Sequence, residues 1–385
     1  MKKPQPMLTK VVVSSLCLSL LMGACQGKKS TVLDEENSGE KQQIKPGLVL
    51  YNSIIEQSNA RGQLLWRLRT KRVSYTQEDK IAKVEGIIGN LYENNRIILQ
   101  LSADGGEVTG EGKEIYMQGN ILVVDTRNKV ELKGEKVVWK PEENYLKLTG
   151  KNKIKASHEN MVVLAEEAEY DTKRQILRLK DNIKATTKQP TLQLSTSRLD
   201  WQVAEDKIIG DKPLTVIRYQ DRLVADIIKT DRGKVDLNQH IATISGNVEY
   251  QSLNPLLIAA TSRLVWYYDK RQVEAPETVL LKQPKEEVTI TANRVNFDME
   301  DKKVYMRGGV YGRNHSRKSE IYADEALWDL AVSPAQIQAT GNVSYKQSEP
   351  PLLVRGIKAW GSLASENILV EGIGNAQVVT TIEIE

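Results

Sequence analysis

A short pattern of apolar residues recurs about every 31 residues along this chain. We call the residue that ends each copy the slot. Residues nine, seven and five positions before the slot form one apolar row that ends in a small residue, and the residue two positions before it is again apolar. Successive slots lie 33, 31, 31, 31, 29, 36, 31, 31 and 33 residues apart, at Tyr75, Val108, Trp139, Tyr170, Trp201, Thr230, Trp266, Phe297, Trp328 and Gly361. Regular repetition at this length predicts one supersecondary unit stacked about ten times into an elongated array.

The alternation of apolar and polar residues predicts that the unit consists of β-strands, because alternate side chains of a strand face the same side. The pattern changes parity between five and two positions before the slot, which predicts a bulge or bend there. Small residues such as Gly134 and Ala165 occupy this place, and in the sixth copy we expect Ala225 to do so. Many units also contain a Gly-Asn pair, as at residues 119–120 and 246–247, which suits a turn or bulge.

Stacked units of this kind predict an all-β fold with two facing sheets and an apolar interior. That interior is either an ordinary closed core or a continuous apolar groove that is open along one side. The large side chains on the inward rows fill the core in the first case and line a groove for apolar chains in the second. The candidate groove residues are Trp66, Leu68, Val73, Tyr75, Leu101, Trp139, Leu146, Leu148, Tyr170, Trp201, Trp266, Phe297 and Trp328.

The N-terminal segment has the pattern of a bacterial export signal. Lys2, Lys3 and Lys10 precede an apolar run, and small residues follow just before Cys25. The segment Leu-Met-Gly-Ala-Cys at 21–25 is similar to a lipobox, although Met22 departs from the usual Leu. We therefore expect a signal peptide at residues 1–24 and a lipid attached to Cys25. Residues 25–46 would then form the lipidated cysteine and a polar, flexible tether of about 20 residues.

Charge and motifs argue against nucleic-acid binding and catalysis. The net charge is +4 over 385 residues, and three of the lysines lie in the expected signal peptide. A mature chain so close to neutral is unsuited to neutralising phosphates. The three histidines, at 158, 240 and 315, sit beside polar turn residues, and the pairs of acidic residues fall at turns or on opposite strand faces. We find no catalytic or phosphate-binding motif and expect no enzyme activity, no metal and no cofactor.

Two groups of motifs carry a resemblance to a known family. Residues 48–124 resemble the LptC family of lipopolysaccharide-export proteins, with an opening strand at residues 51–58, Leu-Trp-Arg-Leu at 65–68 and Met-Gln-Gly-Asn-Ile at 117–121. The later repeats resemble the related OstA/LptA units, in which Ala-x-x-Ala-x-Tyr-Asp, here at 165–171, precedes a Gly-Asn-Val phrase. The resemblance divides the mature chain into an LptC-like module at 47–125 and OstA/LptA-like repeats at 126–385.

The resemblance implies an open β-jellyroll, or β-taco, whose apolar groove carries the acyl chains of lipopolysaccharide. It also implies a non-enzymatic role between an inner-membrane ABC transporter and a periplasmic bridge protein of the LptA type. We expect a periplasmic lipoprotein, anchored to the inner membrane in preference to the outer. Two features depart from the family: we expect a lipid anchor where LptC proteins often carry one transmembrane helix, and the chain is about twice the usual length. The alternative is a structural or adhesive β-solenoid lipoprotein with a closed core.

Overall fold

The computed structural model describes residues 47–59, 61–76, 81–159, 161–362, 368–372 and 379–381. The expected signal peptide, Cys25 and tether lie outside these residues. Residues Lys45–Glu385 form one compact unit, and its described part is almost entirely β-structure, as predicted. No helix among the described residues is long and apolar enough to cross a membrane.

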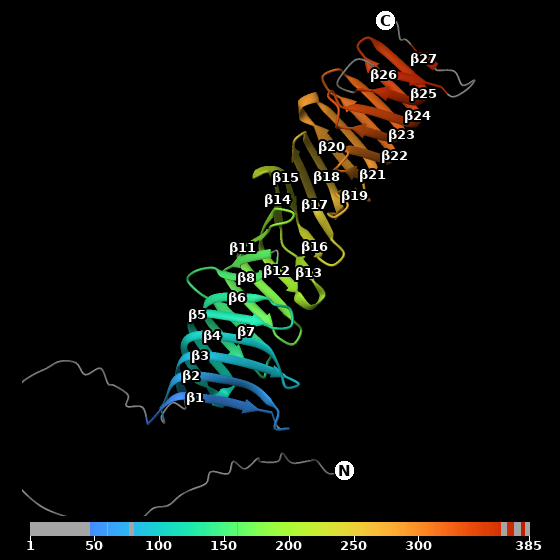
Figure 1. Cartoon of the computed structure of the whole chain (residues 1–385). Coiled ribbons are helices and arrows are strands. Elements are labelled where there is room, and N and C mark those ends of the chain that lie inside the picture. Colours follow the sequence, from blue (N-terminus) through green and yellow to red (C-terminus); the bar gives the residue numbers. More distant parts are fainter. Residues whose placement is uncertain are drawn as a thin grey trace, which may run out of the picture. The chain divides into compact units, whose positions relative to one another are not determined.

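The unit contains strands β1 to β27 and three short 3-10 helices (Figure 1). The strands of the first half are β1 Leu48–Ser58, β2 Leu64–Thr76, β3 Ile81–Glu93, β4 Arg96–Thr109, β5 Glu114–Asp125, β6 Glu131–Lys140, β7 Tyr145–Thr149, β8 Ile154–His158, β9 Met161–Ala165, β10 Glu167–Asp171, β11 Ile176–Thr187, β12 Leu192–Gln202 and β13 Lys207–Gly210. Those of the second half are β14 Leu214–Gln220, β15 Leu223–Thr230, β16 Arg232–Asp236, β17 Ile241–Leu253, β18 Leu256–Tyr267, β19 Gln272–Ala275, β20 Val279–Gln283, β21 Val288–Asp298, β22 Lys303–Asn314, β23 Ser319–Asp329, β24 Gln336–Ser348, β25 Pro351–Gly361, β26 Ile368–Glu371 and β27 Val379–Thr381. The 3-10 helices are η1 Gly110–Gly112, η2 Val203–Glu205 and η3 Pro284–Glu286.

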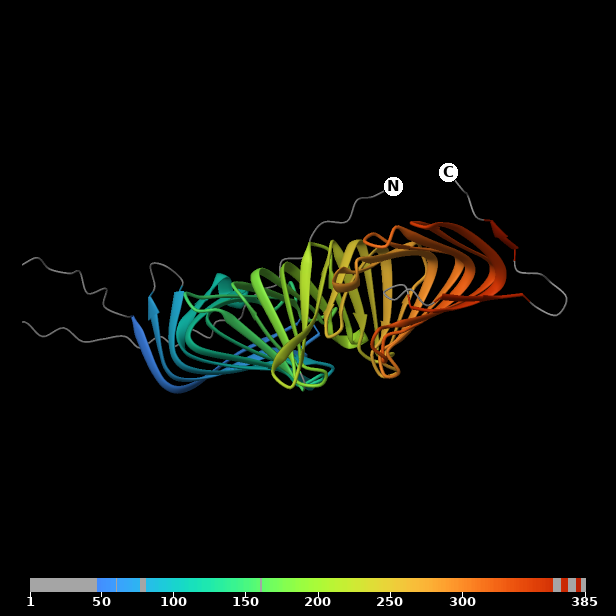
Figure 2. The ribbon, with the colours of Figure 1, turned by 90° about the horizontal axis from the view of Figure 1, so that it is seen from above.

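Most long strands are bent near their middle, so that each one belongs to two facing layers. The second half of β6 pairs with β7 and its first half with β8, while β11 pairs with β10 and β9 in the same divided way. We call the layer that contains the slot residues arm 1 and the layer that contains the residues nine and seven positions earlier arm 2. Figure 2 shows the bent strands stacked one behind another. The antiparallel ladders of both arms continue through the described repeats, which confirms the predicted array.

The bends lie where the change of parity predicts them, and they have a recurring polar structure. The register of the ladder shifts at the Gly-Asn pairs, for example at residues 119–120, where Gly119 has a φ of 77° and Asn120 a φ of 44°. The Asn120 amide donates to the Asp104 carboxylate of the preceding strand at 2.8 Å, and Asn342 does the same to Asp324 at 2.8 Å. These positive φ values explain why Gly and Asn recur here.

The sixth repeat differs from the prediction. Its bend lies at Asp231, between β15 and β16, and not at Ala225, which is within β15. Thr230 therefore occupies the small position before the bend, where its hydroxyl donates to the Ser245 carbonyl oxygen at 2.9 Å. Thr261 makes the equivalent bond to the Thr278 carbonyl at 3.0 Å. The slot of this repeat is thus Val235, which shifts the neighbouring intervals from 29 and 36 residues to 34 and 31.

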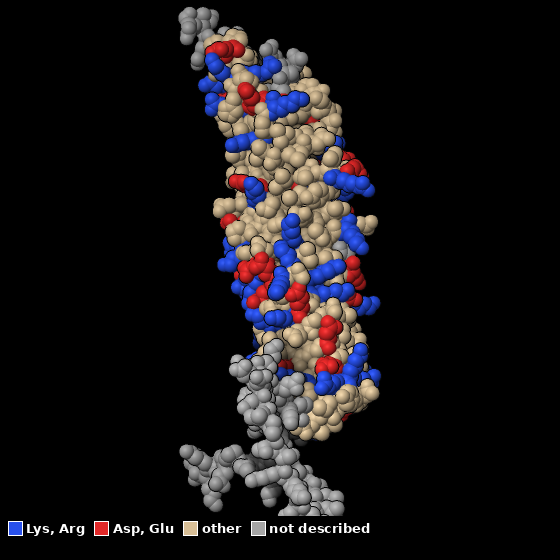
Figure 3. Space-filling view, turned by 90° about the vertical axis from the view of Figure 1, so that its left-hand side faces the viewer, with Lys and Arg blue, Asp and Glu red and all other residues tan. Residues whose placement is uncertain are grey.

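The inward rows of the two arms pack into two separate apolar cores. The first core extends from Trp66 to Ile208, and the second from Ile244 to Ala359. Outside, basic residues three positions before the slot, such as Lys136 and Arg263, are exposed as predicted. On the face in Figure 3, Lys and Arg side chains are interspersed with Asp and Glu side chains.

Candidate functional site

A large cavity lies between the arms where the first core ends and the second begins. Its volume is about 970 Å³, which is within the range of pockets that hold a small lipid or cofactor. Aliphatic side chains of both arms line it. Those of arm 2 are Leu192, Leu194, Leu214, Val216 and Ile228, and those of arm 1 are Leu199, Ile208, Val235, Ala242 and Ile244. Several of these side chains, including Leu194, Val216 and Ile228, are only half-buried, so that apolar surface is available to a ligand.

Small residues on arm 1 explain why the arms do not fill this space. Gly210 and Gly233 are opposite each other in the β13–β16 ladder, next to the pair Ile208 and Val235. In the packed core the corresponding places hold Leu148 and Ala168, followed by Leu146 and Tyr170. Leu214 packs against both glycines, but the valine at the slot is much smaller than the Trp or Tyr of other repeats. The missing side-chain volume leaves the cavity.

A second, more polar cavity of about 860 Å³ adjoins the first toward the tips of the arms. The two cavities share Gln189, Pro190, His240, Trp266 and Tyr268. Turns from both arms border the second cavity, including residues 220–221 and 254–255 of arm 2 and residues 268–271 and 299–302 of arm 1. Backbone hydrogen bonds link each of these turns to a neighbouring turn of the same arm. The Tyr219 N–H donates to the Thr191 carbonyl oxygen in arm 2, and the Tyr268 N–H donates to the His240 carbonyl oxygen in arm 1.

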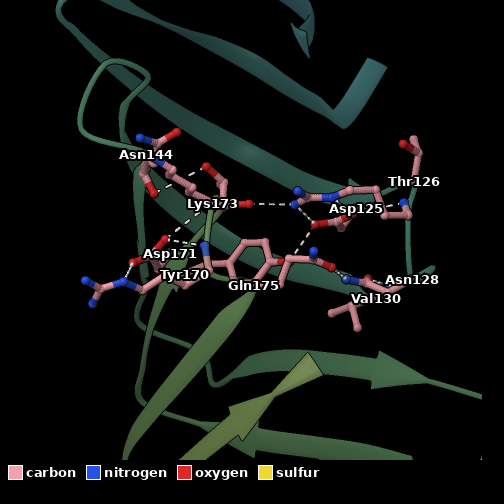
Figure 4. Close-up of polar contacts among 12 residues, drawn as sticks. Asp125, Thr126, Asn128, Val130, Asn144, Tyr170, Asp171, Lys173 and Gln175 are labelled. Atoms are coloured by element: carbon pink, nitrogen blue, oxygen red, sulfur yellow. Dashed lines mark hydrogen bonds and ion pairs between the residues drawn. The ribbon is translucent and has the colours of Figure 1, made fainter. Parts of the chain in front are cut away.

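On the N-terminal side of the cavity, polar contacts join the tips of the arms (Figure 4). Asp125, at the end of β5 in arm 2, is 1% exposed and accepts hydrogen bonds from the Tyr170 hydroxyl at 2.5 Å and from Arg127 Nε at 3.0 Å. Arg127 also donates to the Thr172 carbonyl oxygen of arm 1 at 2.6 Å. Burial, and then the charge of Asp125, raise the pKa of Tyr170, so the phenol stays protonated as a donor. This network closes the arms over the packed core.

On the C-terminal side the arms are also joined. The Glu286 carboxyl of arm 2 lies beside the Ala335 backbone N–H of arm 1. Burial raises the pKa of Glu286, whereas this N–H acts to lower it. The open stretch of the interior therefore lies between the Arg127 contact and the Glu286 contact, over β12 to β18.

The candidate groove residues fall into three groups. Trp266 and Phe297 line the cavities, whereas Tyr75 is 45% exposed. The others are buried in the two packed cores: Trp66, Leu68, Val73, Leu101, Trp139, Leu146, Leu148, Tyr170, Trp201 and Trp328. Many of the side chains around the cavity are aliphatic residues of repeats five to seven that the aromatic pattern did not single out. The facing glycines, Gly210 and Gly233, were the signal that could have located it.

Two of the histidines that sit beside turn residues, His158 and His240, line the first cavity. The His158 ring packs edge-on against Trp201, with ring centroids 5.7 Å apart, and His240 Nδ1 hydrogen-bonds the Asp269 carboxylate. Among the described residues, no group of His, Cys, Asp and Glu side chains has an arrangement that could hold a metal ion.

The fold and this site define a class: an array of bent β-strands that encloses an apolar cavity between two arms. Residues 11–147 match the family described as lipopolysaccharide-assembly, LptC-related. The match supports an LptC/LptA-like lipopolysaccharide-assembly protein, a family with a role in lipopolysaccharide transport. It begins within the predicted signal peptide and extends past the predicted module boundary at residue 125, and it covers little more than a third of the chain. A search of the curated proteins found no match.

Proposed function

We propose that this chain is a periplasmic carrier that shields the acyl chains of lipopolysaccharide in the cavity between its arms. The observation that supports this most is the aliphatic lining of a cavity of about 970 Å³ in a chain with an LptC-related segment. Each methylene that leaves water for such a lining gains about 0.8 kcal/mol. Binding of this kind needs no covalent step, so the chain would act without being an enzyme.

We propose that lipid passes along the interior from an inner-membrane ABC transporter toward a bridge protein of the LptA type. At the N-terminal end of the array, β1 pairs only with β2 among the described strands. Its Leu48, Leu50, Tyr51 and Ile54 side chains are exposed. An unpaired apolar edge of this kind favours strand addition by a partner. The packed cores on both sides of the cavity mean that lipid moving beyond it must separate the arms.

The length of the array supports the hypothesis that the chain does part of the work of the bridge protein. We predict that a form truncated after Asp125 fails to restore lipopolysaccharide transport in a strain lacking the full chain, since it has lost every side chain that lines the cavity. The measurement is lipopolysaccharide at the cell surface, with the amount of each protein form determined in the same cells. Full transport by the short form would refute the hypothesis.

Attachment to the membrane through Cys25 is a separate proposal, based on the lipobox-like segment before it. Replacing Cys25 by Ser is expected to abolish incorporation of a radiolabelled fatty acid and to release the protein from the membrane fraction. Cys17→Ser is the matched control, because that residue lies in the expected signal peptide. Undiminished labelling of the Cys25→Ser protein would contradict the anchor.

A structural scaffold is the second candidate function. The observation in its favour is the dense packing between Trp66 and Ile208, where Trp139, Leu146, Leu148 and Trp201 are fully buried. In that role the array would span a distance without holding lipid. Binding of lipopolysaccharide by the purified chain separates the two candidates, because only the carrier binds it.

A further inference from the structure

One buried polar cluster lies inside the open stretch of the interior. Arg218 of β14, Asp226 of β15 and Tyr250 of β17 are on three consecutive strands of arm 2 and line the second cavity. Asp226 is 5% exposed. It pairs with the Arg218 guanidinium through Nε and a terminal nitrogen, and it accepts a hydrogen bond from the Tyr250 hydroxyl at 2.7 Å. We call these three residues the inner triad.

The contacts around Asp125 involve the same three residue types and join the two arms. There, Arg127 binds Asp125 and also donates to the Thr172 carbonyl oxygen across the arms. Arg218 has no such second acceptor among the described residues, because its hydrogen bonds and ion pair all go to Asp226. A guanidinium has five N–H donors, so Arg218, which lines the second cavity, has donors beyond those used by Asp226.

The inner triad lies next to the apolar cavity, because two residues line both spaces. Val216 and Ile228, which line that cavity, also line the small space beneath Arg218 and Asp226. If the hydrocarbon of a ligand lay against Val216 and Ile228, the end of the hydrocarbon that joins the headgroup would therefore lie near Arg218. Because Asp226 already neutralises the guanidinium, the triad suits a neutral acceptor better than a phosphate.

We propose that the inner triad is an anchoring site for the linkage region of a bound amphiphile, meaning the ester or amide carbonyls and hydroxyls that join acyl chains to a headgroup. Arg218 donates to the carbonyl oxygen, and Asp226 and Tyr250 hold the guanidinium in place. The anchor fixes the depth at which acyl chains enter the apolar cavity. This inference rests on the proposed carrier function and adds the recognised chemical group to it.

The test replaces the charged pair by apolar residues of similar size in the full chain, as Arg218→Met with Asp226→Leu. Changing both residues together avoids leaving one buried charge unpaired. The matched control is Arg178→Met with Asp200→Leu, an arginine–aspartate pair at opposite positions of the β11–β12 ladder on the outer face. Two probes are titrated: lipid A, whose acyl chains carry ester and amide linkages, and the apolar fluorophore N-phenyl-1-naphthylamine, which has no carbonyl.

The double variant of the inner triad is expected to bind lipid A roughly tenfold or more weakly, the loss that a hydrogen bond to a charged group implies. Its affinity for the fluorophore is expected to remain, and the outer-face control should bind both probes as the natural protein does. Equal affinity of natural protein and double variant for lipid A would overturn the anchor, as would an equal loss of both probes. Failure of the natural protein to bind either probe would instead contradict the carrier function itself.

Discussion

Replacing Ile228 by Glu is expected to abolish lipopolysaccharide binding while the array stays folded. The Ile228 side chain is half-buried and lines the apolar cavity. When the cavity is empty, water in it can hydrate the new carboxylate. An acyl chain in the same space would have to remove that water, and dehydrating a carboxylate costs several kcal/mol. We expect at least a hundredfold loss of affinity in a titration of the purified protein with lipopolysaccharide.

The adjacent residue supplies the control for this substitution. Ile227 lies next to Ile228 in β15, and the alternation of a strand directs its side chain to the opposite face. Ile227→Glu adds the same charge to the same strand, and we expect it to bind lipopolysaccharide as the natural protein does. Circular dichroism and thermal unfolding of both variants are the controls for folding, and we expect both variants to be folded. Equal affinities of the two folded variants would contradict the assignment of the cavity.

Replacing Trp139 by Ala is expected to lower the free energy of unfolding by about 3–5 kcal/mol. The Trp139 side chain is 0% exposed, and its ring centroid lies 6.3 Å from that of Trp66 in the first core. Removing the indole leaves a void that the rigid ladders on either side cannot close. Because Trp139 Nε1 has no hydrogen-bond partner among the described residues, Trp139→Phe should lose less than the alanine variant.

The measurement for this second prediction is urea unfolding of the purified variants, followed by circular dichroism. Trp360→Ala is the control, since this tryptophan is 37% exposed and its loss should cost much less stability. If Trp139→Ala unfolded at the same urea concentration as the natural protein, the interior at this repeat would not be a packed core. It would then be open groove, as the aromatic pattern alone allowed.

Most of the architecture could be predicted from the sequence because the fold is local and repetitive. Each 31-residue unit carries its own strand alternation, bend and turn, and each bend requires residues such as Gly119 and Asn120 that tolerate a positive φ. The sixth repeat shows where this reasoning fails. Leu223 and Ala225 have the spacing of the apolar row, so the sequence places the bend at Ala225. The bend is at Asp231, whose carboxylate accepts hydrogen bonds from the backbone N–H and the side-chain amide of Asn247 in the next strand.

The sequence predicts that the interior is apolar, but it does not predict where a cavity lies between the arms. An apolar interior follows from the inward rows, but whether the arms touch across it depends on the summed volumes of residues that are distant in the sequence. The small slot residue Val235, beside the facing pair Gly210 and Gly233, leaves space, whereas Trp139 and Tyr170 fill the interior at their repeats. The contact between Arg127 and Thr172 joins turns 45 residues apart, and no repeat pattern indicates which turns meet across the arms.

We propose that acyl chains of lipopolysaccharide lie between the arms at the middle repeats. Site-specific photo-crosslinking in growing cells tests it most directly, with a photoreactive residue placed in turn at Val216, which lines the apolar cavity, and at the neighbouring Ile217. We predict crosslinks to lipopolysaccharide from position 216 and none from position 217. No crosslink from position 216, or equal crosslinking from both positions, would contradict the claim.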